Sequence, residues 1–411
     1  MMERQKQKKG PLEGVRILDL TRALAGPYGS LILGDLGAEV IKIETPQEVA
    51  LEFGSRTPLD PRYSYGGEDV YFLSVNRNKK SLTLNLKVPL ARQVFYELTK
   101  KSDVVFDNFR PDVMEGLGVD YESLKKVNPR IICCSLTGFG PSGPYKDRPA
   151  FDLIIQALSG GISITGDPDS SSPPVRAGIA VADLAGGMFA AHGIMAALYS
   201  RERTGEGQKV DVSLLDGQIS MLGYVAAYYL VSGVIQGRIG TRHQNNPVYG
   251  ALKTKDGYVA ICAHRGPFWR NLCRAMNHEE LINDPRFDTD IKRHQNADEI
   301  WDLLGEIFAT KTTSEWLGRL LECDVPCAPI NAVDAALNDS QVLHSNMIVS
   351  LKRPEGGEIR LVGNPIKMSG TAQQPYEYPV KLGQNTEEIL QGILGYSRQQ
   401  IDELRRNQAI G

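Results

Sequence analysis

The chain has 411 residues, of which 42% are hydrophobic and 23% charged, and its formal net charge is −3. A chain of this length is too long to fold around one ordinary hydrophobic core, and its composition is that of a soluble globular protein. We therefore expect two domains. The near-neutral charge gives no overall attraction for nucleic acid or for an anionic membrane, so neither is an expected partner.

Neither a membrane span nor a secretion signal is expected. No run approaches ~18 uninterrupted apolar residues, and residues 1–9 are charged without the apolar stretch of a signal peptide. The six cysteines lie in apolar segments and the six histidines are dispersed, so we expect no metal site. This set of cysteines is typical of a reducing compartment, and we expect a cytoplasmic protein.

The first part of the chain alternates strand and helix patterns. Residues 15–20 are typical of a strand, residues 28–36 of a helix that ends at Gly37, and residues 38–44 of the next strand. Further strands are expected at 81–86, 103–107, 131–136 and 209–214, and further helices at 89–101 and 152–158. A long apolar pattern over 215–231 closes this part of the chain. This alternation predicts an α/β fold with a parallel sheet covered by helices.

The pattern changes near residue 235. Residues 249–253 and 258–262 flank a Thr-Lys-Asp-Gly turn and predict a hairpin. Helical patterns follow at 268–276, 297–310, 314–322 and 333–337, then a hairpin around 355–357, and then helices at 386–393 and 397–406. We expect a large domain over 1–225, a small α+β domain over 226–330, and a segment over 331–411 that returns to the large domain.

Asp183 is the most informative residue of the sequence because of the residues that surround it. Residues 175–182 form an apolar, strand-like run that stops at Asp183, and Gly186 and Gly187 follow in an Ala-rich helical pattern. An Asp before a helix most often caps it. A carboxylate held ionised beside a glycine-lined opening can also act as a nucleophile. On this segment alone both roles stay open.

Three other segments have both an ordinary and a functional interpretation. The basic run 76–80, with Lys87 close behind, is either solvated surface or a grip on a phosphorylated ligand. The glycine-rich stretches 138–145 and 159–166 are either turns or places where the backbone approaches a ligand. The first strand is followed by a Gly-Pro turn without G-x-G-x-x-G, so dinucleotide binding is poorly supported.

These segments together resemble the class III CoA-transferase superfamily, which includes formyl-CoA transferase and carnitine CoA-transferase. The resemblance runs from Pro11 to the final helix and is closest to members that move CoA between dicarboxylates. It rests on the ordered motifs PLEGVRILDLT (11–21), GDLGAEVIKIE (34–44), NRNKKS (76–81), GFGPSGP (138–144), ADLAGG (182–187) and TGEGQ (204–208).

The resemblance implies a reaction and an assembly. Asp183 would attack the thioester of an acyl-CoA donor such as succinyl-CoA, and aspartyl anhydride and aspartyl-CoA thioester intermediates would pass the CoA to a carboxylic acid, expected to be a dicarboxylate. CoA would be a substrate, with no tightly bound cofactor. The family's fold implies a Rossmann-like large domain, a smaller domain and an interlocked homodimer.

The resemblance also implies which residues bind CoA. Lys79 and Lys87 are the candidates for phosphate contacts. Thr45 and Gly116 stand where some members place an Arg, which puts the usual phosphate contacts in doubt. The matching positions are Leu24 and Ala25 at the adenine, Leu84, Asn85, Leu86 and Lys87 around the nucleotide, Asn108 and Phe109 along the pantetheine, and Pro149, Ala150, Phe151 and Asp152 at the approach to Asp183.

Two other functions and one specificity question stay open. An α-methylacyl-CoA racemase of the same superfamily would need a His where this chain has Phe151, and a hydrocarbon ring cannot exchange a proton. A CoA-binding protein without turnover is the second alternative. A dicarboxylate acceptor needs a cation at its distal end, for which Arg56, Arg242 and His243 are candidates, with surface charge as their ordinary role.

Overall fold

The computed structural model describes residues 10–46, 56–58, 60–169, 171–372 and 374–411. The chain forms two compact units. Unit 1 comprises the described parts of 1–161, 176–234 and 344–411, and unit 2 those of 162–175 and 235–343. The expected division assigned residues 162–175 to the large domain, whereas in the structure they group with unit 2.

Unit 1 is built on a six-stranded sheet in the order β5-β2-β1-β6-β7-β8, and every pairing in it is parallel. Counted within the sheet, this is the order 3-2-1-4-5-6 of doubly wound nucleotide-binding folds. The strands are β1 (Arg16–Asp19), β2 (Glu39–Glu44), β5 (Lys79–Thr83), β6 (Val104–Asp107), β7 (Ile132–Thr137) and β8 (Lys209–Ser213). The predicted parallel sheet is therefore confirmed.

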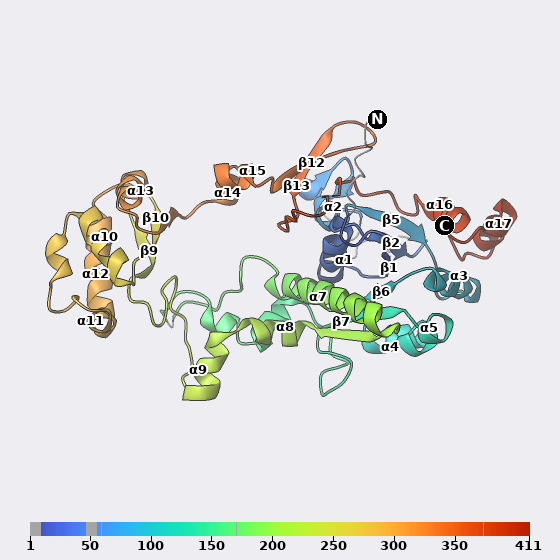
Figure 1. Ribbon diagram of the computed structural model, residues 1–411, viewed down its shortest axis with the longest axis horizontal. Coiled ribbons are helices and arrows are strands. Elements are labelled where there is room, and N and C mark those ends of the chain that lie inside the picture. The colour runs from blue at the N-terminus through green and yellow to red at the C-terminus, as the bar shows by residue number, and fades with distance from the viewer. Residues whose placement is uncertain (1–9, 47–55, 59, 170, 373) are drawn as a thin grey trace. The chain divides into compact units, whose positions relative to one another are not determined.

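Helices cover both faces of this sheet because strand residues alternate between two apolar cores. Ile17 and Phe106 belong to the core shared with α1 (Ala25–Asp35) and α7 (Val181–Thr204), which lie next to each other in Figure 1. Leu18 and Val105 belong to the opposite core, which is closed by α3 (Pro89–Lys100), α5 (Tyr121–Val127), α16 (Thr386–Gly392) and α17 (Arg398–Arg406).

The remaining elements of unit 1 are short. The helices are α2 (Val70–Val75), α4 (Pro111–Gly116), α6 (Asp152–Leu158), α8 (Leu214–Met221) and α9 (Tyr224–Ser232). The hairpins are β3 (Ser64–Tyr65) with β4 (Glu68–Asp69), and β12 (Ile348–Lys352) with β13 (Glu358–Val362). The long apolar pattern over 215–231 is divided between α8 and α9, and Gly223 between them adopts a positive φ of 52°.

Unit 2 contains the predicted hairpin β9 (Tyr249–Lys253) and β10 (Tyr258–Cys262), extended by β11 (Cys327–Pro329). Trp269, Phe308 and Trp316 are buried in its core, and the last two rings stack with centroids 4.5 Å apart. Its helices are α10 (Gly266–Met276), α11 (Asp290–Gln295), α12 (Ala297–Phe308), α13 (Thr313–Glu322) and α14 (Val333–Leu337), followed by α15 (Ser340–His344) at the boundary with unit 1.

Helix α7 is central to unit 1. Among the described residues it is the one helix whose length and mean hydropathy of 1.4 would allow it to cross a membrane, and half of that apolar stretch is buried in the protein. The core helix of a globular protein has the same length and composition. Because Ala190, Ala191 and Ile194 of α7 pack in the core beneath the sheet, we interpret α7 as such a helix.

Glycines allow α7 to approach α1 closely. A Cβ on Gly187 would lie 2.4 Å from the carbonyl oxygen of Ala25, and a Cβ on Gly29 would lie 2.8 Å from the carbonyl oxygen of Gly187. Both obstacles are backbone atoms, which cannot move aside as a side-chain end can. The two glycines therefore set the distance between the N-terminal turns of α7 and the start of α1.

We expect Gly187→Ala to lower the free energy of unfolding by about 1–3 kcal/mol, because the added methyl forces the two helices apart. Urea unfolding measures this change. Gly305→Ala is the control, since its Cβ would meet nothing within 4 Å in α12 and alanine favours a helix by about 1 kcal/mol. Equal behaviour of the two variants would contradict the close approach of α1 and α7.

Candidate active site

The sheet reverses its strand order between β1 and β6, and ligands of doubly wound folds bind at the carboxyl ends of such a pair. The loops that follow these two strands are tied together. The backbone N–H of Arg22 donates to Asn108 Oδ1 at 2.8 Å, Asn108 Nδ2 donates to the Arg22 carbonyl at 2.9 Å, and the Arg22 guanidinium lies 5.3 Å from the Phe109 ring centroid. The structure thus brings Asn108 and Phe109 beside the turn that contains Leu24 and Ala25.

The turn after β1 is held in an unusual conformation. Ala23 has a φ of +59°, which is uncommon for a residue with a Cβ and tends to occur at functional sites. Leu24 follows as the N-cap of α1 without any side-chain cap, and Ala25 is buried. The backbone N–H groups of this helix start are therefore not satisfied by a capping side chain.

A buried ion pair lies beneath this turn, and it overturns one expectation. Lys79 Nζ lies 3.3 Å from Asp19 Oδ2, and it also donates to the Pro27 carbonyl at 3.0 Å and to Asn76 Oδ1 at 3.1 Å. Burial lowers the pKa of Lys79 to about 8, against the opposing effect of Asp19. With its three donors engaged and its side chain 2% exposed, Lys79 cannot contact a CoA phosphate.

The segment after β5, residues 84–87, is only partly accessible to a ligand. The side chains of Leu84 and Leu86 are buried in the core that α3, α5, α16 and α17 close, so only their backbone could line a nucleotide site. Asn85 donates its backbone N–H to the Ala409 carbonyl, and its Oδ1 accepts from the Lys87 N–H. Lys87 is exposed and is the one predicted phosphate-binding lysine that stays accessible.

Asp183 is the third residue of α7, and it does not cap the helix. The N-cap is Ala180, with no side-chain cap, and the segment before it is coil rather than the expected strand. Among the described residues the Asp183 carboxylate has no hydrogen-bond or ion-pair partner. Burial, and then the charge of Asp152, raise the pKa of Asp183 to about 6.

The expected approach residues 149–152 lie at the start of α6, close to Asp183. Asp152 Oδ1 accepts from the backbone N–H of Ala182 at 2.9 Å and of Asp183 at 3.4 Å. Ala150 packs on Gly138, where a Cβ would lie 2.2 Å from its methyl group. Phe151 is 71% exposed, and Pro149 is also exposed.

Tyr71 is a site residue that the sequence did not indicate. It is the second residue of α2, after the N-cap Asp69 that accepts its backbone N–H at 2.9 Å. Burial, followed by the charges of Asp183, Asp69 and Asp152, raises the pKa of Tyr71 above its usual range. A phenol kept protonated near Asp183 can donate a hydrogen bond. No local pattern marks it, since Tyr71 and Asp183 lie far apart in the sequence.

The predicted acceptor-binding cations are engaged elsewhere. Arg56 donates to both carboxylate oxygens of Glu44, at 3.0 and 2.8 Å, and lies over the Phe72 ring. It would have to leave this pair to bind a distal carboxylate, and that role stays a prediction. In unit 2, Arg242 donates to Asp298 at 2.8 Å, and the His243 ring lies 5.5 Å from that of Tyr249. The role of Arg242 and His243 in binding a substrate stays a prediction.

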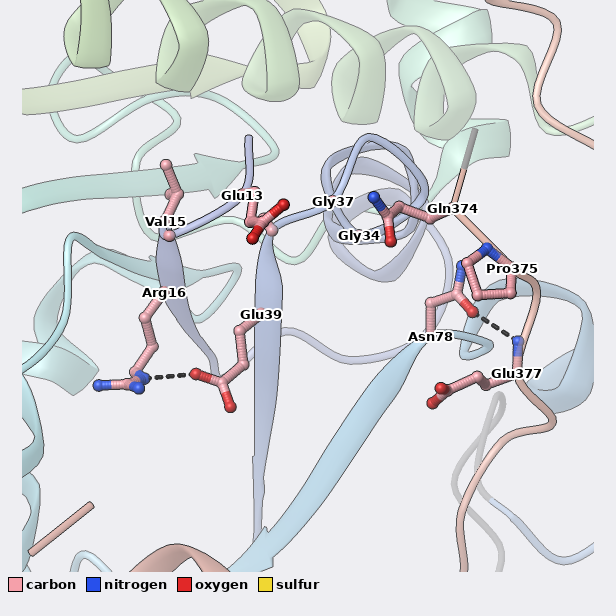
Figure 2. Close-up of a pocket in the computed structure, with 12 residues that line it drawn as sticks. Glu13, Val15, Arg16, Gly34, Gly37, Glu39, Asn78, Gln374, Pro375 and Glu377 are labelled. Atoms are coloured by element: carbon pink, nitrogen blue, oxygen red, sulfur yellow. Dashed lines mark hydrogen bonds and ion pairs between the residues drawn. The ribbon is translucent and has the colours of Figure 1, made fainter. Parts of the chain in front are cut away.

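Two pockets lie at opposite ends of the sheet. One of about 290 Å³, lined by Phe109, Arg110 and Thr137 among others, adjoins the carboxyl ends of β6 and β7. Another of about 300 Å³ lies at the amino ends of β1 and β2, where Figure 2 shows Arg16 paired with Glu39. Only the first is at the end of the strands where doubly wound sheets bind ligands. The described residues contain no group of His, Cys, Asp and Glu that could hold a metal ion.

Comparisons with known proteins agree on one family. Residues 12–386 match the family model described as CoA-transferase family III. The chain is 41% identical to a mouse succinyl-CoA:glutarate CoA-transferase, with 96% of this chain and 89% of that protein covered, and 37% identical to a succinate–glutarate CoA-transferase of Agrobacterium fabrum, with 93% and 96% covered.

Solved structures agree. A CAIB/BAIF family protein from Brucella suis is 33% identical with a TM-score of 0.82, over 94% of this chain and all of that one. Rv3272 from Mycobacterium tuberculosis is 29% identical with a TM-score of 0.81, over 93% of this chain and 99% of that one. Sequence and structure together show that this chain belongs to CoA-transferase family III.

Proposed function

We propose that this protein transfers CoA from succinyl-CoA to a dicarboxylate such as glutarate, with Asp183 as the nucleophile. The observation that carries the proposal is the Asp183 carboxylate, half-buried in the first turn of α7 and without a hydrogen-bond partner among the described residues. The activity for which relatives about 40% identical are named, succinyl-CoA:glutarate CoA transfer, supports the choice of substrates.

The proposed reaction proceeds through two kinds of acylated Asp183. Its carboxylate attacks the thioester carbonyl, and CoA leaves as a thiolate, so a mixed anhydride forms. The thiolate then attacks the aspartyl carbonyl, the donor acid leaves as a carboxylate, and an aspartyl-CoA thioester remains. The acceptor carboxylate attacks this thioester, and the released thiolate attacks the acceptor's acyl carbonyl, which regenerates Asp183.

The environment of Asp183 suits this chemistry. Its pKa of about 6 leaves it ionised at neutral pH, and partial burial increases the reactivity of the carboxylate by removing water. The Tyr71 hydroxyl and backbone N–H groups of the stretch 138–145 are candidate donors to the oxyanion that forms. Shielding matters because anhydrides hydrolyse readily.

We place CoA along the carboxyl ends of β1, β5 and β6. The start of α1, which lacks a capping side chain, and the exposed Lys87 are the candidate contacts for its phosphates. Asn108 and Phe109 flank the path toward Asp183. Because Lys79 is buried and Gly116 carries no side chain, the phosphate contacts must rely more on backbone groups than in relatives with an Arg at that position.

We also propose a homodimer, interlocked as the family resemblance implies. The support is an apolar surface on unit 1 that no described part of unit 1 covers. None of the nine residues of α9 is buried, and Leu230 and Val231 are 77% and 84% exposed. Analytical ultracentrifugation checks this assembly, and a monomer at micromolar concentration would contradict it.

The experiment supplies purified protein with succinyl-CoA and a pool of mono- and dicarboxylates, followed by mass spectrometry. We expect glutaryl-CoA, or the CoA thioester of another dicarboxylate, and a covalent CoA adduct on the intact wild-type chain but not on Asp183→Ala. Formation of no new thioester, with deuterium entering the α-carbon of a 2-methylacyl-CoA, would support the racemase instead. Binding of acyl-CoA without either change would leave a binding protein.

A further inference from the structure

We propose that Asp152 is the positioning residue for Asp183: it holds the first turn of α7 from outside that helix and places a second carboxylate against the nucleophile. This inference rests on the proposed role of Asp183. It assigns to Asp152 a role other than the contact with CoA that the family resemblance implies.

The geometry shows that Asp152 takes the place of a missing cap. The N-cap of α7 is Ala180, which has no side-chain acceptor. Asp152 Oδ1 instead accepts from the backbone N–H groups of Ala182 at 2.9 Å and Asp183 at 3.4 Å. A carboxylate at a helix N-terminus is stabilised by the unsatisfied N–H groups there. Here the carboxylate is held by another helix, so the start of α7 is fixed relative to α6.

The other oxygen of Asp152 is also engaged. Gln156, one turn later in α6 and buried, donates from Nε2 to Asp152 Oδ2 at 2.6 Å. Gln156 Oε1 accepts from the backbone N–H of Ala177 at 2.9 Å. Asp152 and Gln156 therefore hold both ends of the segment 177–182, which leads into the first turn of α7 and the nucleophile. With both oxygens occupied, the Asp152 carboxylate has little left to offer a ligand.

The position of Asp152 affects the reactivity of the Asp183 carboxylate. Among the described residues, the titratable groups that face Asp183 from neighbouring elements are Asp152 of α6 and Tyr71 of α2, and burial keeps the pKa of the Tyr71 phenol above its usual range. Two carboxylates repel each other, but acylation of Asp183 removes its charge. The repulsion therefore raises the free energy of the free carboxylate and not of the anhydride or the thioester, which favours acylation.

Three variants separate the hydrogen bonds from the charge. Asp152→Asn removes the charge but sets an amide NH₂ against the Gln156 donor. Adding Gln156→Glu restores both hydrogen bonds of residue 156, because the Asn amide can donate to the new carboxylate and that carboxylate can accept from the Ala177 N–H. The negative charge then lies one side chain further from Asp183. Asp120→Asn is the matched control, since Asp120 caps α5 by accepting from the Glu122 N–H at 3.1 Å.

The first measurement is the pH dependence of kcat/KM for transfer from succinyl-CoA. Wild type should lose about tenfold per pH unit below a midpoint near 6. Asp152→Asn should move this midpoint to lower pH and reduce kcat at pH 8 by roughly tenfold, with the KM for succinyl-CoA within about twofold. The double variant should recover kcat while its midpoint stays below that of wild type, and Asp120→Asn should leave the midpoint unchanged.

Other outcomes overturn the inference. An unchanged midpoint with a higher KM for succinyl-CoA would mean that Asp152 contacts CoA, and an unchanged midpoint with only a lower Tm would mean an ordinary cap. A second measurement needs no turnover. It compares Tm with and without Asp183→Asn across a range of pH, because the gain in Tm follows the ionisation of Asp183. The comparison is made once with Asp152 present and once in the Asp152→Asn variant. If wild type shows no transfer, the proposed function fails, and this titration still decides whether Asp152 acts on Asp183.

Discussion

Asp183→Asn should reduce CoA transfer by at least roughly 10⁴-fold, because an amide cannot open a thioester by nucleophilic attack and the remaining groups only bind and polarise the substrate. The same variant should be more stable than wild type near neutral pH. The folded protein holds Asp183 with a pKa of about 6, against 3.8 for an ordinary Asp, so its charge costs stability when the chain is folded.

The pH range of this effect follows from the two pKa values. Below about pH 4 both folded and unfolded chains carry a protonated Asp183, and the charge costs nothing. Between pH 4 and 6 the unfolded chain ionises first, so the advantage of Asn grows, and above pH 6 it stays constant at about 1–3 kcal/mol. Urea unfolding from pH 4 to 8 measures this curve. A variant that is both inactive and less stable would suggest misfolding rather than loss of a nucleophile.

Asp19→Ala should be among the most destabilising single changes in unit 1, at about 3–5 kcal/mol, because it leaves the buried ammonium of Lys79 without its counter-ion. It also removes the acceptor of the Thr21 backbone N–H, at 2.9 Å, and of the Ser30 hydroxyl, at 2.6 Å. Despite complete burial, which raises its pKa, Lys79 and Lys42 lower the pKa of Asp19 below the usual value. Urea unfolding monitored by circular dichroism measures the loss.

Two further variants make this prediction specific. Combining Asp19→Ala with Lys79→Met should cost less than the sum of the single changes, since the second substitution removes the unpaired charge. Asp288→Ala breaks the exposed i,i+4 pair with Lys292 and should cost under about 0.5 kcal/mol. A loss of less than about 1 kcal/mol for Asp19→Ala would show that the ion pair does not hold the turn before α1.

Local sequence patterns predict much of this fold. The alternation of strand and helix signals anticipates the parallel sheet, and the expected helix 152–158 and hairpin 249–262 have the bounds of α6 and of β9 with β10. These signals are local: apolar periodicity and a Thr-Lys-Asp-Gly turn. The apolar run 175–182 fails as a strand because periodicity does not reveal whether a sheet has an edge to pair with it. In the structure this segment is held by Gln156 instead.

The site is less predictable, because its parts come from distant positions. Lys79 looks like surface charge in a basic run, yet it alternates with Ser81 and Thr83 on a buried face of β5, where it meets Asp19. Likewise, the sequence around Arg56 gives no sign that its partner in the structure is Glu44. The resemblance to a family located Asp183 and placed Asp152 near it, but only the structure shows the hydrogen bonds of Asp152 to the start of α7 and brings Tyr71 toward the site.

Unit 1 is built from three separate stretches of the chain, so it cannot fold completely until the last of them has been synthesised. The backbone N–H of Thr83 in β5 donates to the Thr386 hydroxyl oxygen, 303 residues later in the sequence, and the core beside β5 is closed by α16 and α17. At a synthesis rate of about 5–20 residues per second, α16 and α17 emerge roughly 15–60 s after β5, and until then the core beside β5 stays open. During this interval unit 2 is complete while an apolar face of unit 1 stays open, so the nascent chain is a natural client for chaperones.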